Sequence, residues 1–456
     1  MFAFEQLTAQ QSVERQTRAA AALTAAGCGS GDRVAIVAHN HPDVLSLAIG
    51  ALRVGVVPVM VNPDLLPTEQ AVILADCEPL VVVYGDSLEA FLDEADVSAW
   101  SGSLADGPLA RPMHYTSGTT GRPKGVWSGV LDPEAAAALL REERELWGFH
   151  SGDRNLVCSP LYHSAPLRFG TGTLMAGGSV VVLRKFTPEA ARTAIRTHTI
   201  TSAFMAPAHL QRIFDLPMDE QPSFESFRLL AHAGAPCPVA LKQRAIEAFP
   251  PGSVWEFYGS TEGQFTACST DDWLTHPGSV GQARPGRVME VDAETGVLWC
   301  RTPSYARFEY WNDSVKTASA WRGEAFSVFD LGRVGDDGFV YLDGRRDDLL
   351  ITGGVNVYPL EVVIALSAMS GVAEVAVFGV DDEHWGSRVC AVIVRDPSGG
   401  ARARTISEHT VMEFAGTVLA PYKRPKQVAF VDEIPKTPTG KVRRSTLARD
   451  LGLDLV

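Results

Sequence analysis

The sequence predicts an α/β fold with a large N-terminal domain of parallel-rich sheets and flanking helices, and a small mobile α+β C-terminal domain. Three observations lead to this prediction. The chain has 456 residues, which is more than one ordinary hydrophobic core accommodates. Short apolar runs alternate with helical stretches from Arg33 onward, and this pattern changes beyond about Gly344. We therefore expect one domain over residues 1–346 and a second over residues 347–456.

The alternating pattern is clearest near the start of the first domain. The run VAIVAHN at Val34–Asn40 predicts a buried strand, and Pro42–Val54 predicts the helix that follows. A later helix that begins at Pro188 has a defined start, because Thr187 is suited to cap it and Glu189 complements the helix dipole. Further strand candidates are LVVVYG, NLVCSP, SVVVLRKF, TSAFMAP, FRLLAHAG and SVWEFYG.

The chain changes character after Gly344. The run GRRDDLL packs charged residues together, and GGVNVYPLE then supplies two glycines and a proline, a composition suited to a hinge between domains. Beyond it we expect a small α+β domain with strands near Val372–Val380 and Val389–Val394, a helix near Ser407–Leu419 and a strand at Val428–Val431.

The composition is that of a soluble globular protein, with 46% hydrophobic and 21% charged residues. The formal net charge of −14 offers no broad basic surface, so neither nucleic acid nor a membrane is expected as a partner. Apolar runs are too short to span a bilayer, and residues 19–26 lack the basic flank of a secretory leader. Seven scattered cysteines indicate free thiols, without metal-site spacing. We expect a cytoplasmic protein.

Residues Tyr115–Gly125, YTSGTTGRPKG, are the most informative segment for function. Glycines and hydroxyl side chains allow such a loop to fold backbone N–H groups and oxygens around phosphate, and Lys124 adds a positive charge. Pro123 and Gly125 exclude the GxxxxGK[ST] pattern of the common P-loop, so a different nucleotide-handling family is indicated. Loops of this composition are often solvated linkers, and the assignment therefore depends on motifs elsewhere.

Four further motifs follow along the chain: YGSTE at 258–262, GRRDD at 344–348, GGVNVYPLE at 353–361 and PKTPTGKVRR at 435–444. Together with YTSGTTGRPKG, and over nearly the full length, they resemble the adenylate-forming superfamily of acyl-CoA synthetases, peptide-synthetase adenylation domains and luciferases. The resemblance implies ATP, Mg²⁺ and CoA as cofactors, and conversion of a carboxylic acid to an acyl adenylate with release of pyrophosphate.

This chemistry explains why cations and hydroxyl groups are needed. A carboxylate does not acylate a thiol at neutral pH because its oxygen is a poor leaving group, whereas AMP leaves an acyl adenylate readily. Two anionic reactants must first be brought together. Cations and N–H donors must therefore be aimed at the charge that develops on the α-phosphate.

The resemblance implies roles for individual residues. The loop ending at Lys124 holds the β- and γ-phosphates, Tyr258 stacks on adenine, Thr261 meets the α-phosphate, and Glu262 holds Mg²⁺, which prefers hard oxygen ligands. The same resemblance implies further cofactor-binding positions: Thr116, Ser117, Gly118, Thr119, Thr120, Gly234, Ala235, Pro236, Gly259 and Ser260.

Asp330 and Arg345 match the residues that hold the ribose in the family. The sequence departs from the pattern here, because Val328 and Phe329 replace the usual Thr-Gly before the aspartate. The loop is therefore free to take a different conformation, and an ordinary turn aspartate near Gly332 is the alternative for Asp330.

Lys441 in the segment PTGK matches the lysine that bridges the acid and the α-phosphate during adenylation. His163 in SPLYHSAP resembles the gate beside the acyl site, with a satisfied core histidine as the alternative. With Thr261 and Glu262, these two residues are the predicted catalytic set.

The resemblance also implies a domain rotation about a hinge at Asp347, which withdraws Lys441 and brings Gly354 toward the incoming thiol. Residues at three positions match those beside the CoA nucleotide, where a cation suits a phosphate and a ring suits stacking. These are Trp385, Tyr422 and Arg424, whose aromatic members also suit ordinary packing.

We expect an AMP-forming acyl-CoA synthetase that acts on a small carboxylic acid, as a monomer or homodimer. One alternative is a stand-alone adenylation enzyme that loads a carrier-protein pantetheine, or uses another acceptor or oxyanion. Another is a catalytically inactive nucleotide-binding protein, which a mobile lysine loop argues against. Candidate acyl-pocket positions favour a compact aromatic or short-chain acid: His163, Ala165, Pro166, His232, Ala233, Gly234 and Gln264.

Overall fold

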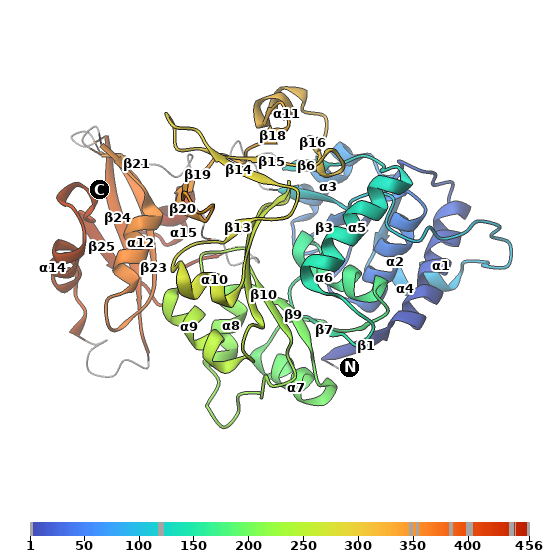
Figure 1. Ribbon diagram of the computed structural model, residues 1–456, viewed down its shortest axis with the longest axis horizontal. Coiled ribbons are helices and arrows are strands. Elements are labelled where there is room, and N and C mark those ends of the chain that lie inside the picture. Colours follow the sequence, from blue (N-terminus) through green and yellow to red (C-terminus); the bar gives the residue numbers. More distant parts are fainter. Residues whose placement is uncertain are drawn as a thin grey trace.

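A computed structural model describes residues 3–116, 123–345, 350–352, 355–382, 386–397, 405–436, 442 and 444–453. Figure 1 shows a large part, coloured blue to yellow, and a smaller orange and red part beside it. The large part contains two mixed sheets with helices between and outside them, and the small part contains one sheet flanked by helices. The α/β fold class predicted from the sequence is confirmed.

The first large sheet has the strand order β16-β6-β5-β3-β2-β4. Its strands β4, β2, β3 and β5 run parallel, whereas β6 and β16 are antiparallel additions at one edge. Helix α3 (Pro67–Cys77) packs on the outer face. The strand bounds are β2 Arg33–Val37, β3 Val57–Val61, β4 Val81–Tyr84, β5 Met113–Thr116, β6 Lys124–Trp127 and β16 Glu309–Tyr310.

The second large sheet has the order β1-β8-β7-β9-β10-β11-β12-β13. Strands β7 to β11 are parallel, and antiparallel strands close both edges. The bounds are β1 Phe4–Thr8, β7 Arg154–Val157, β8 Ser179–Leu183, β9 Ser202–Met205, β10 Leu229–His232, β11 Val254–Gly259, β12 Gln264–Cys268 and β13 Gln282–Ala283.

Helices fill the space between the two sheets and cover the far side of the second one (Figure 1). One apolar cluster joins Ile36 of β2, Leu47 of α2, Leu167 of α6 and Val182 of β8, so α2 and α6 lie between the sheets. Parallel strands require such crossover helices. The inner helices are α1 Ala9–Ala25, α2 Pro42–Arg53, α4 Leu88–Asp93, α5 Pro133–Trp147 and α6 Ser164–Met175, and the outer ones are α7 Pro188–His198, α8 Pro207–Phe214 and α9 Val239–Ala248.

The strands and helices predicted for this part are confirmed. The six further strand candidates correspond to β4 and to β7 through β11. Thr187 caps α7, since its hydroxyl accepts the N–H of Ala190 at 3.1 Å. Strand β2 ends at Val37 rather than Asn40, whose buried amide instead donates to Ser159 O at 3.0 Å.

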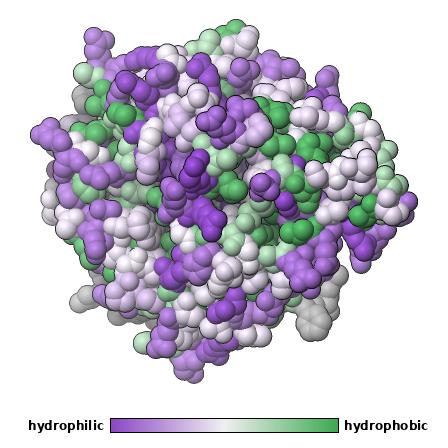
Figure 2. Space-filling view, turned by 45° about the vertical axis from the view of Figure 1, so that its right-hand side comes forward, coloured by the Kyte–Doolittle hydropathy of each residue, from purple (hydrophilic) through white to green (hydrophobic). Residues whose placement is uncertain are grey.

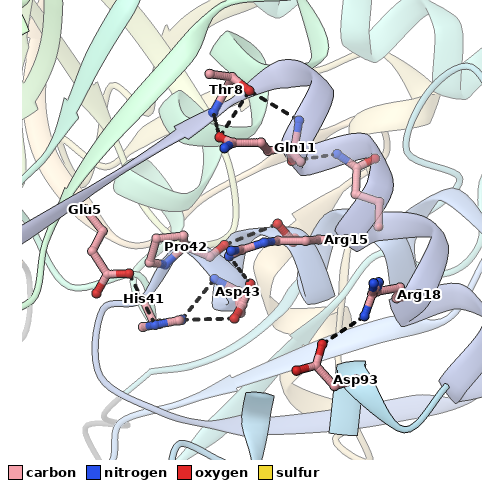
Figure 3. A network of polar contacts seen from close by, with 12 residues as sticks. Glu5, Thr8, Gln11, Arg15, Arg18, His41, Pro42, Asp43 and Asp93 are labelled. Atoms are coloured by element: carbon pink, nitrogen blue, oxygen red, sulfur yellow. Dashed lines mark hydrogen bonds and ion pairs between the residues drawn. The ribbon is translucent and has the colours of Figure 1, made fainter. Parts of the chain in front are cut away.

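Polar contacts hold helix α1 against neighbouring segments of the large part (Figure 3). Thr8 and Gln11 form a capping box, in which Thr8 Oγ1 accepts the Gln11 N–H at 3.2 Å and Gln11 Oε1 accepts the Thr8 N–H at 3.0 Å. Arg18 forms an ion pair of 2.9 Å with Asp93 at the end of α4. Residues 19–23 are all buried, and because five consecutive residues cover the full circumference of a helix, α1 is enclosed on every side here.

The prediction that strand and helix units in a parallel sheet continue to about Gly344 is wrong for residues 282–345. This region forms the antiparallel sheet β14-β15-β18-β17 and the antiparallel pair β19-β20. Several of its connections are too short for parallel crossovers, as between β14 and β15, where Gly296 turns the chain with φ +72°. The bounds are α10 Thr270–Thr275, β14 Val288–Val291, β15 Leu298–Arg301, α11 Ser314–Ala320, β17 Trp321–Arg322, β18 Ala325–Phe326, β19 Asp330–Val334 and β20 Val340–Arg345.

The C-terminal part contains the sheet β22-β21-β24-β23, with β25 added parallel to β24. The three strands and the helix predicted here are confirmed, and the predicted boundary between 346 and 347 lies outside the described residues. The bounds are β21 Leu350–Thr352, β22 Val355–Val357, α12 Pro359–Ser367, β23 Val372–Asp382, β24 Gly386–Arg395, α14 Glu408–Val418, β25 Gln427–Phe430 and α15 Leu447–Asp450.

Hydrophilic residues cover most of the face shown in Figure 2, with smaller hydrophobic groups gathered to the right of its centre. All seven cysteines are unpaired, and six of them are buried. Within the described parts of the chain, none of the helices combines the length and apolar character needed to cross a membrane.

Candidate active site

The YGSTE motif lies where β11 ends. A register shift falls between Tyr258 and Gly259, and the Ser260 N–H donates to Gly263 O at 2.7 Å, so the strand closes into a tight turn. A Cβ on Gly263 would lie 2.5 Å from the ring of Phe326, which explains the glycine there. The Tyr258 ring packs beside Phe265 with centroids 4.6 Å apart.

The predicted ribose-binding residues lie next to this turn. The Tyr258 hydroxyl donates to Asp330 Oδ2 at 2.7 Å, although the two residues are far apart in the sequence. Asp330 also stands directly opposite Arg345 in the antiparallel pair β19-β20. The fold therefore brings together, at one edge, the backbone positions predicted for adenine and ribose.

At the departure from the family pattern before Asp330, the structure places a strained residue. Phe329 adopts φ +62°, the left-handed region that its family glycine enters without strain. Ser327 stabilises this turn, because its hydroxyl accepts the Phe329 N–H at 2.9 Å and donates to Leu298 O at 2.7 Å. The Phe329 side chain joins a small apolar cluster that includes Tyr358, next to α12 of the C-terminal part.

Glu262 and Lys124 approach the same tyrosine. The Tyr310 hydroxyl donates to Glu262 Oε1 at 2.8 Å, and Lys124 Nζ lies 5.6 Å from the centroid of the Tyr310 ring. Thr116 and Lys124 are opposite one another at the ends of β5 and β6, so the predicted phosphate loop starts and finishes here. Sequence reasoning missed Tyr310, because no motif marks a buried tyrosine of a two-residue strand.

His163 occupies the N-cap of α6, with its ring edge-on to Tyr162 at 4.5 Å between centroids. The carbonyl of Tyr162 is 3.1 Å from Nδ1 of the buried His114. Burial lowers the pKa of His114 to about 4, so this ring is neutral at physiological pH. His163 therefore sits at the start of a helix whose first turn lies between the two sheets.

The segment Gly234 to Pro236 follows β10, and Gly234 has φ +93°. Ala231 and Ala233 face an aromatic cluster that includes Phe204 and Phe257. Successive side chains of a strand point to opposite faces, and His232 accordingly points the other way. His232 is thus removed from the candidate acyl pocket.

His232 instead belongs to a buried polar group that sequence reasoning missed. Its Nε2 is 2.6 Å from Lys242 Nζ on α9, and that ammonium group is 3.2 Å from Glu256 Oε2. Burial and the charge of Lys242 hold the pKa of His232 well below its usual value, so the ring is neutral. Lys242 is fully buried, and burial raises the pKa of Glu256.

In the C-terminal part, Tyr422 is 39% exposed on a 3₁₀ turn at Pro421–Lys423. Arg424 donates to the carbonyls of Leu419 and Gly416 at 2.9 and 3.0 Å, so part of its guanidinium closes the end of α14. Several predicted site residues lie outside the described ranges: Ser117, Gly118, Thr119, Thr120, Asp347, Gly354, Trp385 and Lys441.

Two family models cover most of the chain. That of the AMP-binding enzyme matches residues 1–108 and 111–310, and that of the AMP-binding enzyme C-terminal domain matches residues 362–441. The chain belongs to the AMP-binding enzyme family. This membership accounts for the order of the motifs and for the meeting of β5, β11 and β19 around one site.

Individual relatives of this AMP-binding enzyme are ligases. Long-chain-fatty-acid–CoA ligase FadD13 of Mycobacterium tuberculosis is 32% identical over 464 residues, covering 94% of this chain and 90% of the relative. Fatty acid–[acyl-carrier-protein] ligase ScoC of Streptomyces coeruleorubidus is 30% identical, with 97% and 91% covered. This AMP-binding enzyme is therefore an AMP-forming acid–thiol ligase of the acyl-CoA synthetase group.

ATP-bound MatB from Rhodopseudomonas palustris superposes with a TM-score of 0.84 at 30% identity, over 98% of this chain and 93% of MatB. The apo form of MatB gives a TM-score of 0.73 over the same shares of the two chains. The arrangement of this AMP-binding enzyme is therefore closer to the ATP-bound form of that relative.

Proposed function

We propose that this enzyme uses ATP to convert a small carboxylic acid into an acyl adenylate, and then transfers the acyl group to the thiol of CoA. The convergence of Tyr258, Glu262 and Asp330 carries the proposal. The Tyr258 hydroxyl donates to Asp330 at 2.7 Å, and the Tyr310 hydroxyl donates to Glu262 at 2.8 Å, in the turn that follows Tyr258. The three polar side chains lie close together in a largely buried site. Separate roles at adenine, the metal and the ribose explain why they are placed there.

In this proposal the nucleotide lies along the edge formed by β11 and β19. The Tyr258 ring stacks on adenine, and its hydroxyl orients Asp330 toward the ribose hydroxyls, with Arg345 at the same sugar. Thr261 and the loop that ends at Lys124 supply hydroxyl, N–H and ammonium groups for the phosphates. These fixed donors stabilise negative charge as it develops on the α-phosphate.

Glu262 is the proposed protein ligand for Mg²⁺. Carboxylate and phosphate oxygens are the hard ligands that this ion prefers, and the Tyr310 hydroxyl at 2.8 Å orients the carboxylate. In the part of the chain that the structure describes, no group of three or more His, Cys, Asp or Glu side chains is arranged to hold a metal. An ion that arrives with the nucleotide phosphates fits this donor set. When bound, it neutralises phosphate charge.

CoA is the acceptor we propose first, and a carrier-protein pantetheine is the second candidate because ScoC is named as an acyl-carrier-protein ligase. Tyr422 contributes an exposed ring next to the cations Lys423 and Arg424, a pairing suited to a nucleotide with phosphates. The rotation about Asp347, the approach of Gly354 to the thiol and the position of Trp385 beside the CoA nucleotide remain part of the proposal.

The function is tested by a pyrophosphate-release screen over carboxylic acids with ATP and Mg²⁺, with and without CoA. We expect release with at least one small acid and a thioester of matching mass only when CoA is present. Pyrophosphate release without thioester, but with acylation of an added carrier protein, selects the second candidate. Absence of release with every acid, in protein that binds ATP, contradicts the proposed activity.

The hydroxyl of Tyr258 gives a specific prediction. Tyr258→Phe keeps the ring and removes the donor to Asp330, so we expect the KM for ATP to rise about tenfold, or about 1.4 kcal/mol, as for a hydrogen bond to a charged group. ATP titrations of pyrophosphate release measure this change. Tyr84→Phe, at an exposed tyrosine remote from the motifs, is the matched control. An unchanged KM in Tyr258→Phe contradicts the assigned role.

A further inference from the structure

Helices α5 and α6 carry part of a buried arginine cluster, defined as Arg111, Arg168, Arg284 and Arg287 with Glu142 and Glu143. Arg284 Nη2 contacts Glu143 Oε1 at 2.7 Å and Glu142 Oε1 at 2.9 Å. Arg168 Nε lies 3.2 Å from Glu143 Oε2, and Arg287 Nη1 lies 2.6 Å from Glu142 Oε1. Two carboxylates are therefore shared among three guanidinium groups, and Arg111, which donates to Ala306 O at 3.3 Å, lies within their electrostatic influence.

The cluster has a formal charge of +2, and burial leaves it short of hydrogen-bond acceptors. The Arg284 side chain is 0% exposed, yet its Nε and Nη1 have no hydrogen-bond partner. In Arg168, Nη2 has no hydrogen-bond partner, and Nε lies within ion-pair distance of Glu143 without forming a hydrogen bond. Burial lowers the pKa of Arg111 and of Arg168 only to about 10, so both remain charged at neutral pH. Unpaired buried charge is costly, and an anion placed here would offset that cost.

Arg168 is the member that reaches the acyl side of the site. Its guanidinium carbon lies 5.3 Å from the centroid of the Phe257 ring, and Phe257 directly precedes Tyr258. Phe257 shares an apolar cluster with Ala233, and Ala165 packs against that cluster. Ala165 and Ala233 are predicted acyl-pocket positions. The positive group therefore borders the space expected to receive the acid.

The same space is limited by aromatic rings. Phe257 lies 5.8 Å from Phe204, 6.2 Å from Phe169 and 5.6 Å from Trp147, measured between ring centroids. These rings are buried and pack against one another, which leaves little room for a long alkyl chain. Arg168 lies on the same helix as the N-cap residue His163, five positions later. The packed rings favour a short acid.

The geometry points to a short carboxylic acid with a second anionic group as the substrate, with Arg168 binding that group and the rest of the buried arginine cluster holding Arg168 in place. This inference rests on the proposed function and specifies its substrate class as short dicarboxylic acids. Glu143 is already engaged by Arg284 and by the Trp147 indole N–H, at 2.7 and 3.1 Å, so it neutralises Arg168 only in part. A second carboxylate supplies the acceptors that Arg168 lacks, in the paired geometry that guanidinium favours.

The test compares matched acids in ATP-dependent pyrophosphate release. Malonate, succinate and glutarate are each compared with the monoacid of equal carbon number, and succinate also with monomethyl succinate, which adds one methyl group and removes one charge. We expect at least one diacid to exceed its monoacid partner tenfold or more in kcat/KM, mainly through KM. Monoacids that are used as well as every diacid overturn the inference while leaving the proposed function intact.

Variants test whether Arg168 causes the preference for diacids over monoacids. Arg168→Gln is expected to lower the ratio of diacid to monoacid kcat/KM at least tenfold, whereas Arg301→Gln, at an exposed ion pair with Glu290, leaves the ratio unchanged. An unchanged ratio in Arg168→Gln also overturns the inference. Calorimetric titration of the wild-type enzyme with malonate, succinate and glutarate in turn keeps the test independent of turnover. Binding that Arg168→Gln abolishes supports the site even if no acid releases pyrophosphate, and absence of binding by any of the three diacids contradicts it.

Discussion

Lys441→Ala is expected to lower ATP-dependent adenylation about 10²- to 10³-fold, roughly 3 to 4 kcal/mol, by analogy with the loss of one preorganised electrostatic donor. The reason is that the ammonium group is proposed to bridge the acid carboxylate and the α-phosphate, two anions that otherwise repel one another. ATP–pyrophosphate exchange with a saturating acid measures this step directly. Lys441 lies outside the described residues, so the prediction depends on the family resemblance of its loop.

A two-step assay separates this role from general damage. If Lys441 acts only in adenylation, Lys441→Ala converts a preformed acyl adenylate and CoA to thioester at close to the wild-type rate. Lys436→Ala, which removes a nearby lysine paired with Glu374 at 2.8 Å, serves as the matched control in both assays. Near-normal exchange in Lys441→Ala would exclude Lys441 from the catalytic set.

Glu143→Gln is expected to reduce the free energy of unfolding by about 3 to 5 kcal/mol, because it leaves buried guanidinium groups without one of their two carboxylates. The substitution keeps the size of the side chain and an acceptor for the Trp147 indole N–H, now at 3.1 Å from Glu143. Urea unfolding at neutral pH measures the change. Glu145→Gln, on the exposed face of the same helix, is expected to differ from wild type by less than about 0.5 kcal/mol.

The pH dependence of this difference follows from the pKa of Glu143. Burial disfavours its charged form, but the charges of Arg284 and Arg168 outweigh burial and lower the pKa from 4.5 to about 2. A depressed folded-state pKa means that the unfolded chain takes up the proton first, so this stabilisation is complete above pH 4.5 and is lost as the pH falls toward 2. The stability gap between wild type and Glu143→Gln should close over that range. A gap that stays constant contradicts the assignment.

Local signals explain which elements the sequence predicts. Strand β2 and helix α2 follow from an apolar run and from the helical pattern behind it, and the start of α7 follows from the capping chemistry of Thr187. The antiparallel pair β19-β20 was not predictable in this way. Its short strands resemble those of a parallel unit until their partners are known.

In the candidate site, too, some features were predictable from local sequence and others were not. The five motifs indicate the nucleotide chemistry, because hydroxyl, glycine and charged residues in those orders are typical of nucleotide-handling sites. The hydrogen bond from Tyr258 to Asp330 and the role of Tyr310 beside Glu262 join residues that are distant in the chain. Neither hydrogen bond could be predicted from the sequence around either of its two residues.

The sequence by itself determined the family, the α/β fold and the identity of the residues predicted to handle ATP, because these depend on local patterns and on motifs that are each contained in a short segment. Only the tertiary structure decided that His232 turns toward Lys242, that Phe329 takes over a glycine conformation, and that buried arginines border the acyl side. These features arise from side chains that meet across separate helices and strands, where burial and uncompensated charge exist only after the chain has folded.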